Sequence, residues 1–254
     1  MKVIKKWKTY VRTYYDLYTD YAKFKQQKKE LNDNDFILGG GSHLHPCFED
    51  KMASSGIAKG AYFHQDLLVA QRIFQNNPQT HIDIGSRIDG FVAHVASFRE
   101  IKVFDIRPPE NTVKNIKFSQ LDFMTELPQE MVESCDSLSC LHAIEHFGLG
   151  RYGDTINFNG HLLGMENLYK LLKHGGTLYF STPMGEPQQI KFHAHRIFSL
   201  RYLLKQFNGK YKIKRFSFVN DEGYLFENVN LSEENINTSF HCKYGCGIFE
   251  LEKI

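Results

Sequence analysis

The 254-residue sequence lacks the features that would assign it to a secreted or membrane-spanning class. Its five cysteines are an odd number without a repeating spacing, which excludes the disulfide framework of a small secreted protein. It has no apolar run of about 20 residues, the length that a membrane span requires, and its N-terminus has no apolar run like that of a signal peptide. We therefore expect a cytoplasmic protein without a transmembrane segment.

A strong charge imbalance is also missing. Lys and Arg number 31 against 29 Asp and Glu, which gives a formal net charge of +2. This balance argues against nucleic acid as a partner, because nucleic-acid-binding proteins present a basic face to the phosphates. With 42% hydrophobic residues, the chain can bury one large core. We expect an N-terminal extension over residues 1–60 and one domain over residues 61–254.

The extension begins with apolar and aromatic residues at helical spacing, and basic residues lie between the first of them. The stripe consists of Val3, Trp7, Tyr10, Val11, Tyr14, Leu17, Tyr18, Tyr21 and Phe24. We favour a helix that packs on its own domain or on a second subunit, giving a homodimer, because tyrosines suit protein contacts. Peripheral contact with a membrane surface is the alternative. His43 and His45 follow in a loop that is either a lid or an exposed turn.

Short apolar runs alternate with helical stretches from Gln79 onward, which predicts parallel strands joined by crossover helices. Strands are expected at 81–84, 101–105, 115–120, 136–141, 176–182, 211–219 and 247–251. Helices are expected at 63–76, 88–98, 160–173 and 198–207. The last two strands are typical of an antiparallel hairpin. The predicted fold class is therefore α/β, with a mostly parallel seven-stranded sheet and an N-terminal helical extension.

A strand end, a glycine turn and a helix start follow one another over residues 80–91. A glycine such as Gly85 lets the backbone pass close to a ligand, because a Cβ would fill the approach. Asp105 closes the next strand, where a carboxylate can accept both hydroxyl hydrogens of a ribose. Asp122, after the third strand, is placed to take the amino hydrogens of an adenine. Each acid alone is equally consistent with the capping of a following helix.

This arrangement resembles the class I S-adenosylmethionine-dependent methyltransferases, whose first motif is Asp/Glu-x-Gly-x-Gly-x-Gly. Asp83 and Gly85 match that motif. Arg87 and Asp89 replace its later glycines, and Gly90 stands one residue late. Arg87 is therefore a candidate to contact the carboxylate of the methionine part.

Later segments extend the resemblance. Residues 171–183 resemble the family's Leu-Lys-Pro-Gly-Gly turn and fifth strand, and residues 104–108 and 148–154 resemble, more narrowly, a branch known only as a domain of unknown function. The resemblance implies a Rossmann-like fold with S-adenosyl-L-methionine as the cofactor. The cofactor-binding residues that it implies are Asp83, Gly85, Ser86, Arg87, Gly90, Asp105, Ile106, Arg107, Asp122, Phe123 and Leu141.

The candidate catalytic residues follow the fourth strand, at the sheet edge where ligands bind. If this turn is helical, His142, Glu145 and His146 converge. A hydroxyl acceptor must lose its proton, so His146 is a candidate general base. The resemblance adds a second interpretation, because small-RNA 2′-O-methyltransferases hold a divalent metal with a similar cluster. Here the cluster would be His142, Glu145, His146 and His195 around Mg, Mn or Fe. In a third interpretation, the Glu-His pair only shapes the pocket.

A glycine-rich run over residues 148–154 adjoins this turn. Arg151, Tyr152 and Asp154 are candidates for substrate binding, with Arg151 as an anion clamp. A tight turn capped by Asp154 is the structural alternative. Further substrate-binding candidates are His193, His195 and Arg196. Near the end of the chain, buried structural cysteines are favoured over a zinc site at His241–Cys246.

The resemblance, together with the polar residues of the candidate site, implies O-methylation of a small-molecule acceptor that is polar, such as a sugar or nucleotide-activated sugar of a bacterial surface polysaccharide. A non-catalytic adenosyl-binding or scaffold protein is the alternative from another class. An NAD-dependent Rossmann enzyme is a weaker one, because the sequence has no Gly-x-Gly-x-x-Gly for a pyrophosphate. RNA methylation is disfavoured because the basic density lies mainly at the distant N-terminus.

Overall fold

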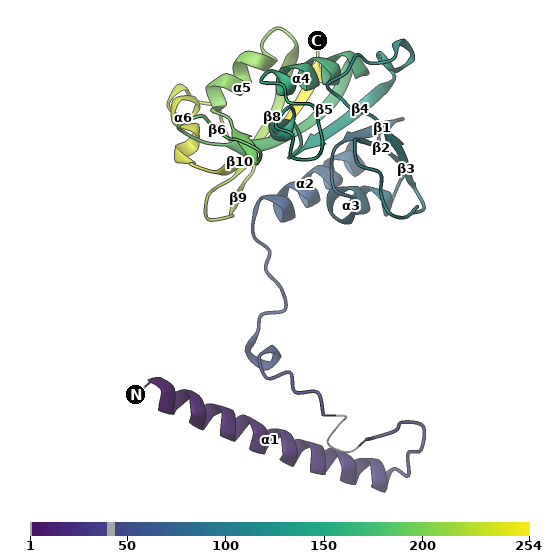
Figure 1. Ribbon diagram of the computed structural model, residues 1–254, viewed down its shortest axis with the longest axis vertical. Coiled ribbons are helices and arrows are strands. Elements are labelled where there is room, and N and C mark those ends of the chain that lie inside the picture. The colour runs from purple at the N-terminus through teal and green to yellow at the C-terminus, as the bar shows by residue number, and fades with distance from the viewer. Residues whose placement is uncertain (1, 40–43) are drawn as a thin grey trace. The chain divides into compact units, whose positions relative to one another are not determined.

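The computed structural model describes residues 2–39 and 44–254 of the chain. The chain divides into two compact units, Met1–Ile57 and Ala58–Ile254 (Figure 1). Part of the predicted stripe and loop lies outside the described residues. The side chains of four stripe residues are not described, namely Val3, Trp7, Tyr10 and Val11, and His43 is not described at all.

The first unit is dominated by one long helix, α1 (Lys2–Glu30). Part of its aromatic stripe contacts the segment that follows the helix, because the rings of Tyr14 and Phe48 meet edge to face with their centroids 4.8 Å apart. Tyr18 and Phe24 remain exposed. The role of this unit as a lid or subunit contact stays a prediction. No helix in the described part of the chain combines the length and apolarity of a membrane span.

The second unit is built on an eight-stranded sheet with the strand order β3-β2-β1-β4-β5-β10-β8-β9. The strands from β3 to β5 are parallel, and β10 enters antiparallel between β5 and β8. This confirms the prediction of a mostly parallel sheet ended by antiparallel strands. The main strands are β1 (His81–Ile84), β2 (Ile101–Asp105), β3 (Ile116–Gln120), β4 (Cys135–Leu141), β5 (Leu172–Met184), β8 (Tyr211–Val219) and β10 (Gly245–Lys253).

The sheet has one strand more than the predicted seven. The extra strand, β9 (Leu225–Phe226), pairs with the end of β8. The chain reverses between them in a turn where the Asn220 side chain accepts from the Tyr224 N–H at 2.9 Å. A separate antiparallel pair, β6 (Gln189–Lys191) and β7 (His195–Ile197), was also not predicted. Strands of two or three residues are too short to show an alternating pattern in the sequence.

The four helices predicted in the second unit lie close to their predicted positions, with one correction, and a fifth helix over Glu233–Thr238 was not predicted. The predicted helix 88–98 is divided into a π-helical turn over Ile88–Val92 and the single turn of α3. Gly90 interrupts the helix with φ −121° and ψ −115°. The helices are α2 (Ala61–Asn76), α3 (Ala93–Ala96), α4 (Gly160–Leu171), α5 (Leu200–Phe207) and α6 (Glu233–Thr238).

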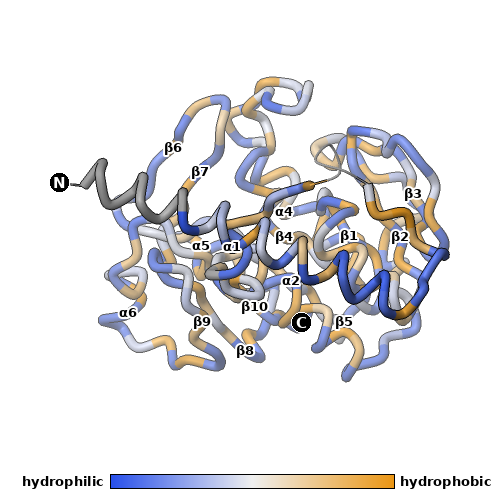
Figure 2. The backbone as a smooth tube through the Cα atoms, turned by 90° about the horizontal axis from the view of Figure 1, so that it is seen from below, coloured by the Kyte–Doolittle hydropathy of each residue, from blue (hydrophilic) through white to orange (hydrophobic). Residues whose placement is uncertain are grey.

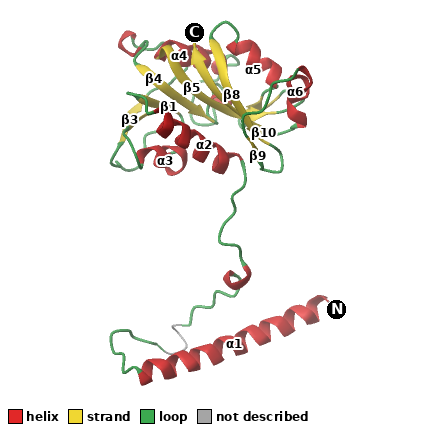
Figure 3. Cartoon of the chain, turned by 180° about the vertical axis from the view of Figure 1, so that it is seen from behind, coloured by secondary structure: helices red, strands yellow, loops and turns green. Residues whose placement is uncertain are grey.

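Helices cover both faces of the sheet, as Figure 3 shows. Ile73 of α2 belongs to one core cluster and Leu168 of α4 to another. Successive residues of a strand point to opposite faces, so Tyr179 of β5 joins the first cluster and Phe180 the second. Figure 2 shows hydrophobic residues, in orange, interspersed with hydrophilic ones along the tube. Parallel strands covered on both faces need apolar side chains in both directions.

A buried ion pair connects helix α2 to strand β10 of the sheet. Arg72 Nη1 lies 3.4 Å from Glu250 Oε2, and both residues are buried. Arg72 also donates to Ser217 Oγ at 3.3 Å and to Asn228 Oδ1 at 3.1 Å. These partners satisfy a charge that would otherwise be costly to bury.

Replacing Glu250 with alanine is expected to lower the free energy of unfolding by about 3–5 kcal/mol, because the Arg72 guanidinium then stays buried without its carboxylate. Urea unfolding followed by circular dichroism measures this loss. The matched control is Glu252→Ala on the same strand, whose partner Lys214 is 43% exposed and whose loss should cost about 1 kcal/mol or less. Equal losses in the two variants would contradict the role given to the buried pair.

Candidate functional site

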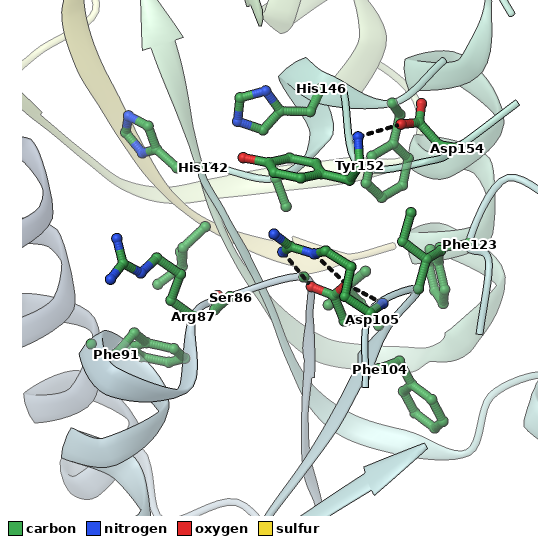
Figure 4. Close-up of a pocket in the computed structure, with 18 of the residues that line it drawn as sticks. Ser86, Arg87, Phe91, Phe104, Asp105, Phe123, His142, His146, Tyr152 and Asp154 are labelled. Carbon is green, nitrogen blue, oxygen red and sulfur yellow. Dashed lines mark hydrogen bonds and ion pairs between the residues drawn. The ribbon is translucent and has the colours of Figure 1, made fainter. Parts of the chain in front are cut away.

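A cavity of about 540 Å³ lies at the carboxyl ends of β1, β2 and β4. The chain runs from β1 to β2 and β3 on one side and returns to β4 and β5 on the other, so the strand order reverses here. In open parallel sheets, ligands bind in the crevice at such a reversal. Figure 4 shows that the lining residues come from the strand ends and from the segment that follows β4.

A buried carboxylate holds the turn after β1. Asp83 accepts hydrogen bonds from the Ser86 N–H at 3.0 Å, the Ser86 hydroxyl at 2.8 Å and the Ser139 hydroxyl at 2.5 Å. Burial raises the pKa of Asp83 to about 7. Gly85 and Ser86 line the cavity, but Asp83 does not. Asp83, which the sequence places among the cofactor-binding residues, therefore shapes the wall from behind.

Two glycines of this turn leave no room for a side chain. Gly85 has φ +77°, and a Cβ there would lie 2.8 Å from the Cβ of Ala143. A Cβ on Gly90 would lie 2.9 Å from Asp66 Oδ2. Both glycines line the cavity, so the backbone itself forms part of its wall.

Arg87 and Asp89 stand beside this turn where the family motif has glycines. Arg87 Nη2 lies 2.6 Å from Asp89 Oδ2, and the two side chains are 74% and 70% exposed. Solvent screens such a pair, so it contributes little stability. Both residues line the cavity. The contact of Arg87 with a ligand carboxylate stays a prediction.

Asp105, at the end of β2, is engaged by Arg107. Its carboxylate accepts from the Arg107 N–H at 2.8 Å, from Nε at 3.0 Å and from Nη2 at 2.8 Å. The same guanidinium lies over the Tyr152 ring, 4.0 Å from its centroid. Figure 4 shows the Tyr152 ring between His146 and Asp105. Asp105, Arg107 and Tyr152 thus connect the end of β2 with the 148–154 loop across the cavity.

An apolar wall adjoins Asp105. It includes Phe104, Leu121 and Phe123, and the predicted Ile106 and Leu141 also line the cavity. Such a surface suits a flat aromatic ligand group, because it removes apolar area from water. A further predicted residue, Asp122, lines the cavity while its Oδ1 accepts from the Met124 N–H at 2.9 Å.

His142 does not join the helical turn that the sequence predicts. The turn is a 3₁₀ turn over Ile144–His146, and His142 precedes it with φ +49°. Its Nδ1 lies 2.8 Å from Gln65 Oε1 of α2. Burial lowers the pKa of His142 to about 3. His142 therefore lines the cavity as a neutral ring held by α2, and its predicted place in a cluster with Glu145 is corrected.

His146 has one nitrogen fixed and one free. Its Nδ1 donates to the Ala194 carbonyl at 2.6 Å. A carbonyl only accepts, so Nδ1 carries the proton and Nε2 keeps a lone pair. Nε2 lies 3.7 Å from Glu145 Oε1. Burial lowers the pKa of His146 to about 4 and raises that of Glu145 to about 8, so both are uncharged near neutral pH.

The predicted metal site does not fit this geometry. Among the described residues there is no group of three or more His, Cys, Asp or Glu side chains placed to hold a metal ion. The reason is that His142 turns to Gln65 and the Nδ1 of His146 turns to a carbonyl. Cys242 and Cys246 are buried free thiols that belong to different core clusters, in line with the structural interpretation of these cysteines.

The 148–154 loop is organised by Asp154. Its carboxylate accepts from the N–H groups of Gly148, Gly150 and Tyr152 at 2.8, 3.1 and 3.2 Å. This is the capped turn that the sequence leaves as the alternative. The loop carries the Tyr152 ring to the edge of the His146 ring, with centroids 5.3 Å apart. Arg151 Nη1 donates to the Ala194 carbonyl at 3.2 Å.

The three candidates from the β6–β7 region lie outside the wall of the cavity. Arg196 is only 3% exposed and donates to the carbonyls of Glu145 and Phe147. These hydrogen bonds hold the turn that carries His146. His195 stacks at a tilt on Tyr244, and its Nε2 has no hydrogen-bond partner among the described residues. His193 is exposed in the turn between the two strands.

The sequence did not identify three residues of α2 that line the cavity. They are Tyr62, Gln65 and Asp66. They precede the glycine turn on a helix with an ordinary amphipathic pattern, so only their place in the fold marks them. Burial raises the pKa of Asp66.

Comparison with known proteins agrees with this fold. The family model described as "Caenorhabditis protein of unknown function, DUF268" matches residues 101–244. No curated protein matches the sequence. Among solved structures, the N-methyltransferase NodS from Bradyrhizobium japonicum WM9, in complex with S-adenosyl-L-homocysteine, gives a TM-score of 0.50 at 10% identity and covers 81% of this chain and 95% of that chain.

Two further solved structures have the same fold. The 1,6-didemethyltoxoflavin-N1-methyltransferase of Burkholderia thailandensis, with 1,6-didemethyltoxoflavin and S-adenosylhomocysteine bound, gives a TM-score of 0.52 at 11% identity, covering 74% of this chain and 78% of that chain. The [4+2]-cyclase SpnF gives 0.52 at 13% identity, with 75% and 80% covered. These likenesses confirm the Rossmann-like methyltransferase fold that the sequence predicts.

The imidazole of His146 is expected to titrate near pH 4, well below the ordinary value of about 6.5, because burial disfavours its charged form. NMR titration of the histidine Cε1–H resonances measures this, with His146→Ala identifying the resonance. A midpoint at or above pH 6.5 would show that the ring is not held neutral.

Proposed function

The chain belongs to the DUF268 family, whose description assigns no activity, and from its site we propose that it is an S-adenosylmethionine-dependent methyltransferase. The observation that carries the proposal is the cavity at the point where the strand order reverses. Asp105 lies there at the end of β2, beside an apolar wall, and the backbone at Gly85 is exposed to the cavity without a side chain. Likeness of fold to methyltransferases solved with S-adenosylhomocysteine supports it.

The residues present fit an adenosyl group. In this proposal Asp105 accepts the ribose hydroxyls, and Phe104, Leu121 and Phe123 pack on the adenine. The turn through Gly85 faces the sulfonium end. Arg87 reaches the methionine carboxylate as a charge-assisted donor.

Binding at Asp105 has to compete with Arg107. A carboxylate has about four acceptor positions, and Arg107 fills three of them through its N–H, Nε and Nη2. A ribose that needs two positions must therefore displace at least one of these contacts. Since Arg107 also lies over Tyr152, its displacement frees one side of the Tyr152 ring.

For the acceptor, we propose a hydroxyl group and hence O-methylation. When bound, S-adenosylmethionine supplies an electrophilic methyl group. The lone pair of His146 Nε2 is placed to take the hydroxyl proton, while the Nδ1–H bond to Ala194 fixes the ring. A small polar acceptor such as a sugar or nucleotide-activated sugar fits a site of tyrosine and histidine side chains. A role in surface polysaccharide synthesis remains part of this proposal.

Fold alone does not decide the reaction, because the [4+2]-cyclase SpnF has the same fold. A non-catalytic adenosyl-binding protein is therefore the second candidate. It is favoured by the low pKa of His146, since a base is most effective when its pKa lies near the working pH. The two candidates differ in one measurable property, the transfer of a methyl group.

Calorimetric titration with S-adenosylhomocysteine is expected to show binding that Asp105→Asn weakens by about 10- to 100-fold, because a charged hydrogen bond is lost. The matched control is Glu100→Gln, which removes an exposed carboxylate just before the other end of β2 and should leave affinity unchanged. NAD should not bind. Absence of S-adenosylhomocysteine binding, or equal affinity in the Asp105→Asn variant, would refute the cofactor assignment.

Methyl transfer is expected to fall by about 10²- to 10⁴-fold in His146→Ala, while the affinity for S-adenosylhomocysteine is retained. The measurement follows methyl-labelled S-adenosylmethionine into the small-molecule fraction of a cell extract. His174→Ala is the control, since His174 is exposed at the turn before the parallel part of β5. Bound cofactor without transfer by the wild-type protein would favour the non-catalytic candidate.

A further inference from the structure

A rim of cationic and aromatic side chains lies beside the ring of His146. We call it the acceptor rim, and it consists of Arg151, Tyr152, Lys191, His195 and Tyr244. Ring contacts connect it to His146. The His146 centroid lies 5.3 Å from that of Tyr152 and 6.5 Å from that of His195, and the His195 centroid lies 5.0 Å from that of Tyr244.

The two cations stand over the aromatic members of the rim. Lys191 Nζ lies 5.3 Å from the Tyr244 centroid, and Arg151 Cζ lies 5.1 Å from the Tyr152 centroid. Cation–π contacts of this kind orient a charged head without neutralising it. The heads of Arg151 and Lys191 are therefore positioned but keep their charge.

One carbonyl aligns the candidate base and a cation. Ala194, in the turn between β6 and β7, accepts from His146 Nδ1 at 2.6 Å and from Arg151 Nη1 at 3.2 Å. Two donors on one oxygen must lie close together. The guanidinium of Arg151 is therefore held next to the His146 ring, within about 6 Å of its Nδ1.

The two cations of the rim differ from the arginines that line the cavity in having no ion-pair partner among the described residues. The two arginines that line the cavity have partners, since Arg87 pairs with Asp89 and Arg107 with Asp105. In the described ranges, neither Arg151 nor Lys191 has a carboxylate within ion-pair distance.

In the described part of the chain, three acids lie close to the rim, and none forms an ion pair with its cations. Asp154 accepts from the Tyr152 N–H at 3.2 Å and Asp221 from the Tyr244 N–H at 2.8 Å, so both carboxylates are engaged by backbone groups. Glu145 Oε1 lies 3.7 Å from His146 Nε2, and burial raises the pKa of Glu145 to about 8. The guanidinium of Arg151 and the ammonium group of Lys191 therefore keep donors for a ligand.

We propose that the acceptor rim is an oxyanion subsite and that the acceptor carries a phosphate or carboxylate group close to the hydroxyl that is methylated. Arg151 binds the oxyanion with its planar donors, since a guanidinium matches such groups bidentately. Lys191 adds a second positive charge. The inference rests on the proposed function and restricts it to acidic acceptors.

The experiment uses the whole chain saturated with S-adenosylhomocysteine. Inorganic phosphate and acetate are titrated separately, with glycerol as the neutral comparison, and the His146 resonances are followed by NMR. We expect saturable shifts with at least one oxyanion and none with glycerol. The two oxyanion arms show whether phosphate or carboxylate is preferred.

Arg151→Ala is expected to weaken the oxyanion response by about tenfold or more. Arg99→Ala is the matched control, because Arg99 also donates only to carbonyls, those of Glu100 and Gln79, but lies near the start of β1. Binding of S-adenosylhomocysteine by each variant reports that it is folded.

The possible outcomes distinguish failure of the proposed function from failure of the oxyanion subsite alone. If S-adenosylhomocysteine does not bind the wild-type chain, the proposed function fails. If it binds, but neither oxyanion shifts the His146 resonances, or both variants respond equally, only the oxyanion subsite is overturned.

Discussion

The geometry of the site depends on one buried carboxylate. Asp83 joins the turn after β1 to the neighbouring strand β4 through Ser86 and Ser139. A buried carboxylate is costly unless its oxygens are hydrogen-bonded, so this network specifies a single path for the turn. That path brings Gly85 against Ala143 and opens the cavity between β1 and β4. Asp83, which does not line the cavity, therefore positions Gly85 and Ser86, which do.

Much of the fold was predictable because long parallel strands and their helices carry strong patterns. The ends of β1 and β2 were predictable for the same reason, and with them the position of Asp105. The roles of individual side chains were not, because they depend on contacts between distant segments. Asp83 matches the family motif yet lies behind the wall, and Arg196 lies beneath the His146 turn. Gln65 contributes to the site only because α2 packs against β5 and β10.

The short β6–β7 pair explains how the surroundings of His146 are organised. Its turn supplies the Ala194 carbonyl that orients both His146 and Arg151. Across the cavity, Arg107 reaches from β2 to Tyr152 in the loop beside His146. The Asp105 side and the His146 side of the cavity therefore share Tyr152 as a common contact, and a change at Asp105 alters the surroundings of that ring.

The position of β10 means that the sheet can be completed only late in synthesis of the chain. β10 pairs with β5 on one edge and with β8 on the other, although both are synthesised before it. Until β10 leaves the ribosome, β5 and β8 each present an unpaired edge, which is a template for association with other chains. Tyr244, which stacks on His195, immediately precedes β10. This ring contact therefore forms only when the nascent sheet closes.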